Sequence, residues 1–203
     1  MKILLTGFEP FGKDTVNPSW LAVEKVADKI GRFEVVKAEI PVVFEYSTAK
    51  LYSLMEEHKP DAILLTGLAA NRKAVSVETR AINNDFALIP DNNGNKPENR
   101  VIVESGEQYL YCTYPCEEIV REIKEQGIDC ELSDDVGMYV CNHLLYTLLH
   151  RIKQENLDIR AGFIHVPMMK NQREDQDYDQ GMEMDDMVKA IEIAIKVMDI
   201  YAK

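Results

Sequence analysis

The stretch Lys2-Ile3-Leu4-Leu5-Thr6-Gly7 is apolar at its centre and ends at a polar residue and a glycine. A short apolar run with such a boundary is typical of a β-strand that is buried on both faces. Further runs of this kind occupy residues 33–38, 62–66, 128–132 and 162–166. The sequence therefore predicts buried strands distributed along the whole chain.

Amphipathic helical patterns separate these strands, and we expect helices at residues 20–30, 46–58, 115–126 and 141–154. A last helix has the clearest period, with one apolar stripe formed by Met184, Met187, Val188, Ile191, Ala194, Ile195 and Met198. This alternation predicts an α/β fold, a single-domain α/β/α sandwich with helices on both faces of a mostly parallel open sheet. We expect one domain over residues 1–203, with a hairpin-like excursion from the sheet within residues 78–103.

The composition of the 203-residue chain limits its partners. The net charge is -12, which argues against nucleic acid and anionic membranes as ligands, because both attract basic surfaces. No apolar run is long enough to span a membrane, and the N-terminal run is too short for a signal peptide. The four cysteines do not resemble a disulfide framework. We therefore expect a cytoplasmic protein that binds neither nucleic acid nor membrane.

Cys141 stands where a loop gives way to the helix expected at residues 141–154. A thiol at a helix N-terminus faces unpaired backbone N–H groups and the positive end of the helix dipole, which both favour the nucleophilic thiolate. The same N–H groups could hold an oxyanion during acyl transfer. The competing interpretation is a small buried hydrophobic residue, which describes most free cysteines.

His165 lies at the end of the strand at residues 162–166, at the edge where ligands bind in open α/β sheets. It could take the proton of a thiol and later protonate a leaving amine. Glu78 could orient its imidazole, although each residue alone is explained equally well by an ordinary structural role.

Phe8 and Phe11 follow the first strand directly, and aromatic side chains there could form the walls of a site for a flat, uncharged ring. They could equally be ordinary core residues. The glycines beside them lack the GxGxxG spacing of a phosphate-binding loop.

Two patterns resemble metal sites without completing them. An acidic run suggests a calcium loop through Asp175, Asp177, Asp179, Gly181 and Asp186. Such a loop needs glycine at its sixth position and glutamate at its twelfth, which are Gln180 and Asp186 here. Cys112 and Cys116 lack a second pair of zinc ligands. We expect no metal and no cofactor.

Five segments share their order with a known family. They are Thr6-Gly7-Phe8-Glu9-Pro10-Phe11-Gly12 with Asn17-Pro18-Ser19, Gly67-Leu68-Ala69 with Arg72, Glu78 and Ala81-Ile82-Asn83, Ile89-Pro90-Asp91-Asn92 with Gly94, Tyr139-Val140-Cys141-Asn142-His143, and Phe163-Ile164-His165-Val166-Pro167. In these motifs and in their order, the chain resembles the pyroglutamyl peptidase I family, also called pyrrolidone-carboxylate peptidases, over nearly its whole length.

The resemblance implies a cysteine peptidase that removes an N-terminal pyroglutamyl residue from peptides through a thioester. It implies Cys141 as nucleophile, His165 as acid and base, and Glu78 as the partner of that histidine. The residues it implies around the lactam ring are Phe8, Phe11, Leu68, Tyr139 and Val140. It also implies a cytoplasmic homo-oligomer, a tetramer or dimer, that needs no metal.

The chain departs from the family pattern at several positions. Leu88 stands where an arginine is usual before the Ile-Pro-Asp-Asn run, and Met168 where a tyrosine is usual after His-Val-Pro. These departures motivate an alternative, a non-catalytic or altered-specificity relative that binds pyroglutamyl or related peptide ends. A nucleoside phosphorylase on a similar sheet is a third hypothesis, based only on analogy between folds.

Overall fold

A seven-stranded sheet forms the centre of the computed structural model, which describes residues 1–172 and 181–201. The strands follow the order β2-β3-β1-β4-β9-β5-β8. Their bounds are β1 Lys2–Phe8, β2 Lys29–Ile30, β3 Phe33–Ile40, β4 Ala62–Leu68, β5 Val75–Glu78, β8 Cys130–Ser133 and β9 Arg160–Val166. Strands β3, β1, β4 and β9 pair in parallel, whereas β5 is antiparallel to β9 and β2 is antiparallel to β3. The predicted mostly parallel sheet is confirmed, with antiparallel pairing toward its edges.

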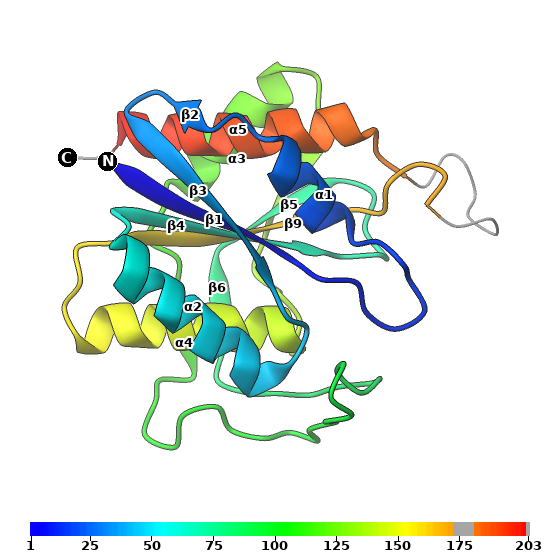
Figure 1. Cartoon of the computed structure of the whole chain (residues 1–203), viewed down its shortest axis with the longest axis vertical. Helices are drawn as coiled ribbons and strands as arrows, with labels where there is room; N and C mark the ends of the chain where they lie inside the picture. The colour runs from blue at the N-terminus through cyan, green and yellow to red at the C-terminus, as the bar shows by residue number, and fades with distance from the viewer. Residues whose placement is uncertain (173–180, 202–203) are drawn as a thin grey trace.

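Helices cover both faces of this sheet (Figure 1). One face carries α1 Pro18–Lys25, α3 Cys116–Glu125 and α5 Met184–Ile200, and the other carries α2 Phe44–His58 and α4 Val140–Gln154. Each face buries its own hydrophobic cluster between helices and sheet. The predicted α/β/α arrangement is confirmed.

The first helix is shorter than the sequence predicted. Helix α1 ends at Lys25, because Val26 already has an extended backbone with ψ 143°. The chain then enters β2 and reverses at Gly31, whose φ of 56° is readily adopted by glycine. Val26 and Ile30 still reach the same core cluster, so their spacing was correctly associated with burial but wrongly with a continuing helix.

Strand β5 was not predicted from the sequence. Its four residues are all buried, and it lies between β9 and β8. Four residues are too few for a clear periodicity, so this strand depends on its two neighbours in the sheet. Its absence from the prediction matters because Glu78 is its last residue.

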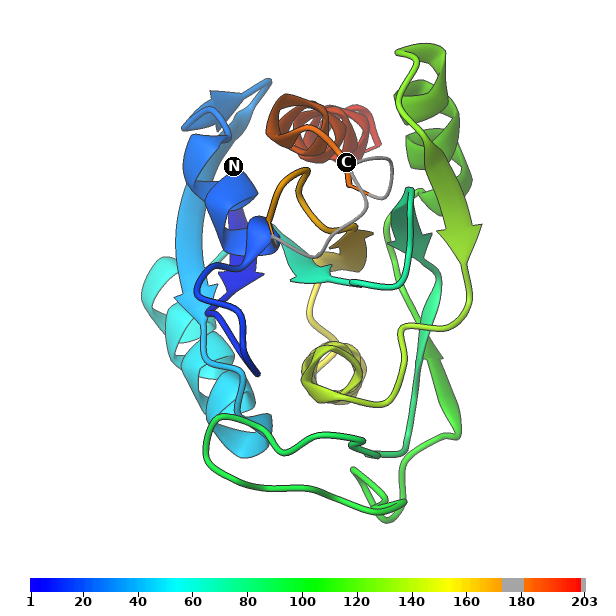
Figure 2. The same cartoon turned by 90° about the vertical axis from the view of Figure 1, so that its right-hand side faces the viewer.

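The expected excursion from the main sheet is confirmed and is longer than predicted. Strands β6 Arg80–Ile82 and β7 Tyr109–Tyr111 form a separate antiparallel pair. Between them Asp85 and Arg100 pair as an antiparallel bridge that closes a hairpin-like loop. The excursion lies on the side of the sheet that carries α2 and α4 (Figures 1 and 2).

Within the described part of the chain, no helix combines the length and the hydrophobicity needed to cross a bilayer. The same residues contain no cluster of three His, Cys, Asp or Glu side chains placed to hold a metal ion. Asp175, Asp177 and Asp179 of the calcium-like run lie outside the described residues.

Candidate active site

His165 reaches the site from the carboxyl end of β9, where the sheet places it between two neighbouring strands. Gly67 of β4 is its partner on one side, and Ser76 of β5 is its partner on the other. Only 4% of His165 is exposed. The edge of the sheet where ligands were expected therefore carries this histidine.

Glu78 lies behind His165 and is fully buried. Its Oε1 is 2.7 Å from Nδ1 of the imidazole. A carboxylate at Nδ1 favours the tautomer with the proton on that nitrogen, which leaves Nε2 free to accept a proton. The pairing of His165 with Glu78 agrees with the sequence prediction.

Arg72 adds a cation to this pair. Its Nη1 donates to the same Glu78 Oε1 at 2.6 Å, and its Nη2 donates to the backbone carbonyl of Asp135. Among residues 1–172 and 181–201, Glu78 Oε2 has no hydrogen-bond partner. Arg72 thus links the carboxylate behind His165 to the loop that precedes Cys141. The sequence analysis named Arg72 only as part of a family motif. It did not predict the ion pair with Glu78, because that contact depends on tertiary structure.

Cys141 is the second residue of α4, at the expected helix N-terminus. The N-cap residue Tyr139 makes no side-chain hydrogen bond to the first backbone N–H groups of the helix. A Cβ added to Gly67 would lie 3.0 Å from Cys141 Sγ. Because Gly67 is the neighbour of His165 in the sheet, this contact brings the thiol to the same edge as the imidazole.

The electrostatic environment of Cys141 differs from the sequence expectation. Burial, and after it the negative charge of Glu78, raises the pKa of the Cys141 thiol to about 12. A backbone hydrogen bond and the positive charge of Arg72 act in the opposite direction. The predicted thiolate stabilisation at the helix N-terminus is therefore outweighed, because burial disfavours a charged sulfur. A nucleophilic Cys141 needs a base at the moment of reaction.

A cavity of about 260 Å³ brings the candidate residues together. Cys141, His165 and Arg72 contribute to its lining. All five residues expected around a flat ring also line it, namely Phe8, Phe11, Leu68, Tyr139 and Val140. The Phe11 and Tyr139 rings are 6.0 Å apart and inclined by 41°. The cavity thus has aromatic and aliphatic walls, a thiol and an imidazole, and polar side chains that include Arg72.

Leu88, the main departure from the family pattern, does not belong to that lining. Its side chain is 80% exposed on the hairpin-like loop. The cavity wall contains its own cation, Arg72, which contacts Glu78. The substitution at position 88 therefore leaves the thiol, the imidazole and the carboxylate in place.

A buried carboxylate, an imidazole and a thiol at a helix N-terminus around one cavity are the arrangement of a cysteine-dependent hydrolase. The pyroglutamyl peptidase family model matches residues 1–200, and the chain belongs to this family. It is 43% identical to a pyrrolidone-carboxylate peptidase of Thermoanaerobacter sp. (strain X514) over 198 residues, 98% of each chain. A pyrrolidone-carboxylate peptidase of Brachyspira hyodysenteriae is 41% identical over 196 residues, 97% of this chain and 98% of the relative.

Solved structures show the same relationship. The pyroglutamyl peptidase I of Bacillus amyloliquefaciens superimposes with a TM-score of 0.94 and 39% identity, covering 100% of this chain and 98% of the other. The pyrrolidone carboxyl peptidase of Thermococcus litoralis also gives a TM-score of 0.94, with 34% identity, 98% of this chain and 94% of the other.

Proposed function

We propose that this chain is a cysteine peptidase that hydrolyses the bond after an N-terminal pyroglutamyl residue. The observation that carries the proposal is that Cys141 and His165 line the same cavity as the apolar residues Phe8 and Phe11. Glu78 lies 2.7 Å behind the imidazole. Membership of the pyroglutamyl peptidase family supports the substrate class.

The apolar walls suit the uncharged lactam. Pyroglutamate lacks the ammonium group that an ordinary aminopeptidase recognises, so its ring can enter between Phe8, Phe11 and Tyr139 without the desolvation of a charge. The polar edges of the ring need hydrogen-bond partners, and each buried group left unpaired costs about 1–3 kcal/mol. Selectivity for the lactam over charged N-termini arises from the difference in these desolvation and hydrogen-bonding costs.

His165 starts the reaction by taking the proton of Cys141 Sγ on Nε2. Glu78 accepts the hydrogen bond of Nδ1–H and stabilises the imidazolium that results. Because the thiol has a pKa of about 12, proton transfer and attack are expected to be coupled rather than preceded by a stable thiolate. The sulfur attacks the pyroglutamyl carbonyl, and N–H groups at the start of α4 face the oxyanion.

The tetrahedral intermediate then collapses. The C–N bond breaks, His165 gives its proton to the leaving amine, and a pyroglutamyl thioester remains on Cys141. His165 next takes a proton from water, which attacks the thioester carbonyl. Release of pyroglutamate returns the proton to the sulfur and restores the starting site.

A pyroglutamyl amide with a fluorogenic leaving group tests the proposal. The protein should release the fluorophore, and Cys141→Ser should abolish release while circular dichroism shows an unchanged fold. Cys130→Ser is a matched control, because Cys130 is a buried thiol in β8 that does not line the cavity. An active Cys141→Ser protein, or an inactive wild type, would contradict the assignment.

The oligomeric state and the compartment are further parts of the proposal. The family resemblance supports a cytoplasmic homo-oligomer, a tetramer or dimer. Light scattering on the purified chain distinguishes these states, and a monomer at micromolar concentration would overturn this part alone.

A further inference from the structure

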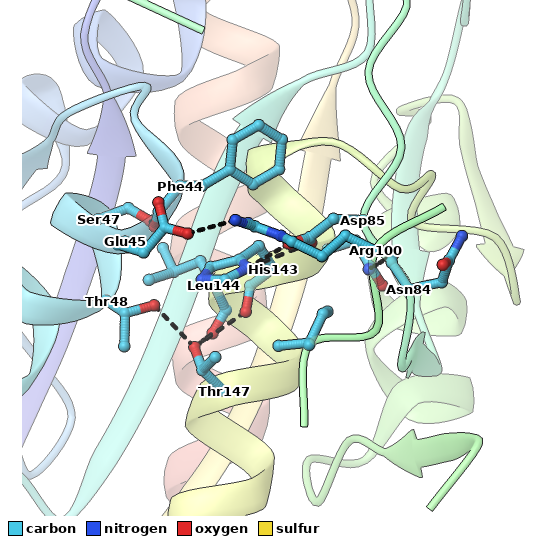
Figure 3. Close-up of polar contacts among 12 residues, drawn as sticks. Phe44, Glu45, Ser47, Thr48, Asn84, Asp85, Arg100, His143, Leu144 and Thr147 are labelled. Atoms are coloured by element: carbon cyan, nitrogen blue, oxygen red, sulfur yellow. Dashed lines mark hydrogen bonds and ion pairs between the residues drawn. The ribbon is translucent and has the colours of Figure 1, made fainter. Parts of the chain in front are cut away.

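A second buried carboxylate–histidine pair joins α4 to the hairpin-like loop (Figure 3). Asp85 is fully buried, and its two oxygens are 2.9 and 3.1 Å from His143 Nδ1. Arg100 donates to Asp85 Oδ2 through Nε at 3.2 Å and Nη2 at 2.7 Å. The third guanidinium nitrogen contacts Glu45 of α2 at 2.6 Å. We name Asp85, His143 and Arg100 the loop cluster.

The proposed reaction does not use the loop cluster. His143 follows Cys141 by two positions, so a helix directs the two side chains to different sides. The ring of His143 packs edge-on against Phe44 of α2, at 5.6 Å between centroids. His143 is absent from the residues that line the cavity. It therefore cannot serve as the base for the thiol.

The loop cluster instead anchors the hairpin-like loop to α4. Asp85 and Arg100 exchange backbone hydrogen bonds of 2.7 and 2.9 Å, so their side chains fix the base of this loop. Asn142, the neighbour of His143, holds the preceding segment through the backbone of Ile82 and Asn84. Both anchors are in the first turn of the helix that carries Cys141.

From this base the loop reaches the walls of the cavity. The Tyr139 hydroxyl donates to the Pro90 carbonyl at 3.0 Å. Asn92 donates from its backbone to Val42 at 3.0 Å and from its side chain to the Pro10 carbonyl at 2.9 Å. Tyr139 and Val42 line the cavity directly, and Pro10 lies between the two wall residues Phe8 and Phe11. The loop thus contacts three segments of the chain that line the cavity or adjoin its lining.

We propose that Asp85, His143 and Arg100 are positioning residues that set the separation of the walls enclosing the pyroglutamyl ring. A buried ion pair is often no more stabilising than apolar side chains of similar volume, whereas its directional hydrogen bonds define one geometry. The inference rests on the proposed function, because it takes the cavity as the lactam site. It predicts an effect on substrate affinity that is separate from the chemical step.

His143→Leu and Arg100→Met test this role with the fluorogenic pyroglutamyl amide. We expect KM to rise about tenfold in each variant while kcat changes less than threefold. His143→Asn should restore KM to near the wild-type value, because its amide nitrogen can occupy a position close to that of Nδ1. Arg151→Met, which removes two ion pairs farther along α4, with Glu56 and Glu155, is the matched control and should change neither constant.

Calorimetric titration with free pyroglutamate compares the affinities of the same variants without turnover. A higher Kd is expected for His143→Leu and Arg100→Met. Alkylation of Cys141 by iodoacetamide should keep its wild-type rate in both. An unchanged KM and Kd in folded variants would overturn the inference, as would a fall in kcat alone or failure of His143→Asn to restore KM. An inactive wild type that binds pyroglutamate would contradict the proposed peptidase activity instead.

Discussion

Two clusters of nearly the same composition lie at different places in the fold, one on β5 and β9 and the other where the hairpin-like loop meets α4. In one, Glu78 is paired with His165 Nδ1 at 2.7 Å and with Arg72 at 2.6 Å. In the loop cluster, Asp85 is paired with His143 Nδ1 at 2.9 Å and with Arg100 at 2.7 Å. Both carboxylates are fully buried.

The surroundings of the two clusters give them different roles. His165 faces a cavity that also contains the Cys141 thiol, whereas His143 packs against the Phe44 ring. The Arg72 guanidinium reaches a loop beside the cavity, whereas that of Arg100 reaches α2. An acid–histidine–arginine set therefore indicates chemistry only where a nucleophile and a substrate space adjoin it.

Substitution of the two histidines should give the largest difference in kcat between the two clusters. His165→Ala removes the group that moves every proton in the mechanism, so kcat should fall on the order of 10⁴-fold or more. His143→Leu should leave kcat within threefold. Steady-state kinetics on the same pyroglutamyl amide measures both, and equal losses of kcat would remove the distinction.

The two carboxylates offer a second comparison. Glu78→Gln keeps the shape but supports the wrong imidazole tautomer, so kcat of the folded protein should fall about 10²–10⁴-fold. Stability should fall as well, because the variant loses the buried ion pair with Arg72. Asp85→Asn should lower stability by about 1–3 kcal/mol, because it weakens the hydrogen bonds to His143 and to the half-exposed Arg100, and it should leave kcat of the folded protein within threefold. Activity assays and urea denaturation distinguish them. A stable but inactive Asp85→Asn protein would contradict the account.

The two arginines should differ more modestly. Arg72→Met removes a charged hydrogen bond to Glu78, and kcat should fall about tenfold to a hundredfold. Because Arg72 acts through Glu78, adding Arg72→Met to Glu78→Gln should cost little more. Additive losses in this double-mutant cycle would show that Arg72 contacts the substrate or the sulfur independently.

The smallest effect concerns pH and stability. The pKa of Cys141 is about 12 in the folded chain and has an ordinary value of 9.0, so the folded state keeps the thiol protonated. The contribution of this protonated thiol to the stability of the folded state is complete below pH 9.0 and is lost as the pH rises toward 12. Cys141→Ser should therefore lessen the fall in Tm above pH 9.0. An identical pH dependence of Tm in the variant would contradict a Cys141 thiol that the folded chain keeps neutral.

The sequence predicted the elements and residues that follow local rules. Cys141 and His165 were predicted as site residues because each stands at an element boundary, and Glu78 because of its motif. Strand β5 was missed because four buried residues carry no distinct period. The elevated pKa of Cys141 and the ion pair of Arg72 were not predictable, because both depend on neighbours that folding brings from distant segments.

The Asp85–His143 pair illustrates the same limit. Fifty-eight positions separate the two residues in the chain, and nothing local to either one indicates the contact. Helix geometry alone predicts that His143 points away from Cys141, but its partner and its link to the cavity walls required the structure.

Identification of the acylated residue tests the central claim most directly. A pyroglutamyl ester should acylate the protein faster than the thioester hydrolyses, which gives a burst of released alcohol. Rapid acid quenching and peptide mass spectrometry should then find one pyroglutamyl group on Cys141 and none on the Cys141→Ser protein. Turnover with the adduct on another residue, or a burst that persists in Cys141→Ser, would contradict the account.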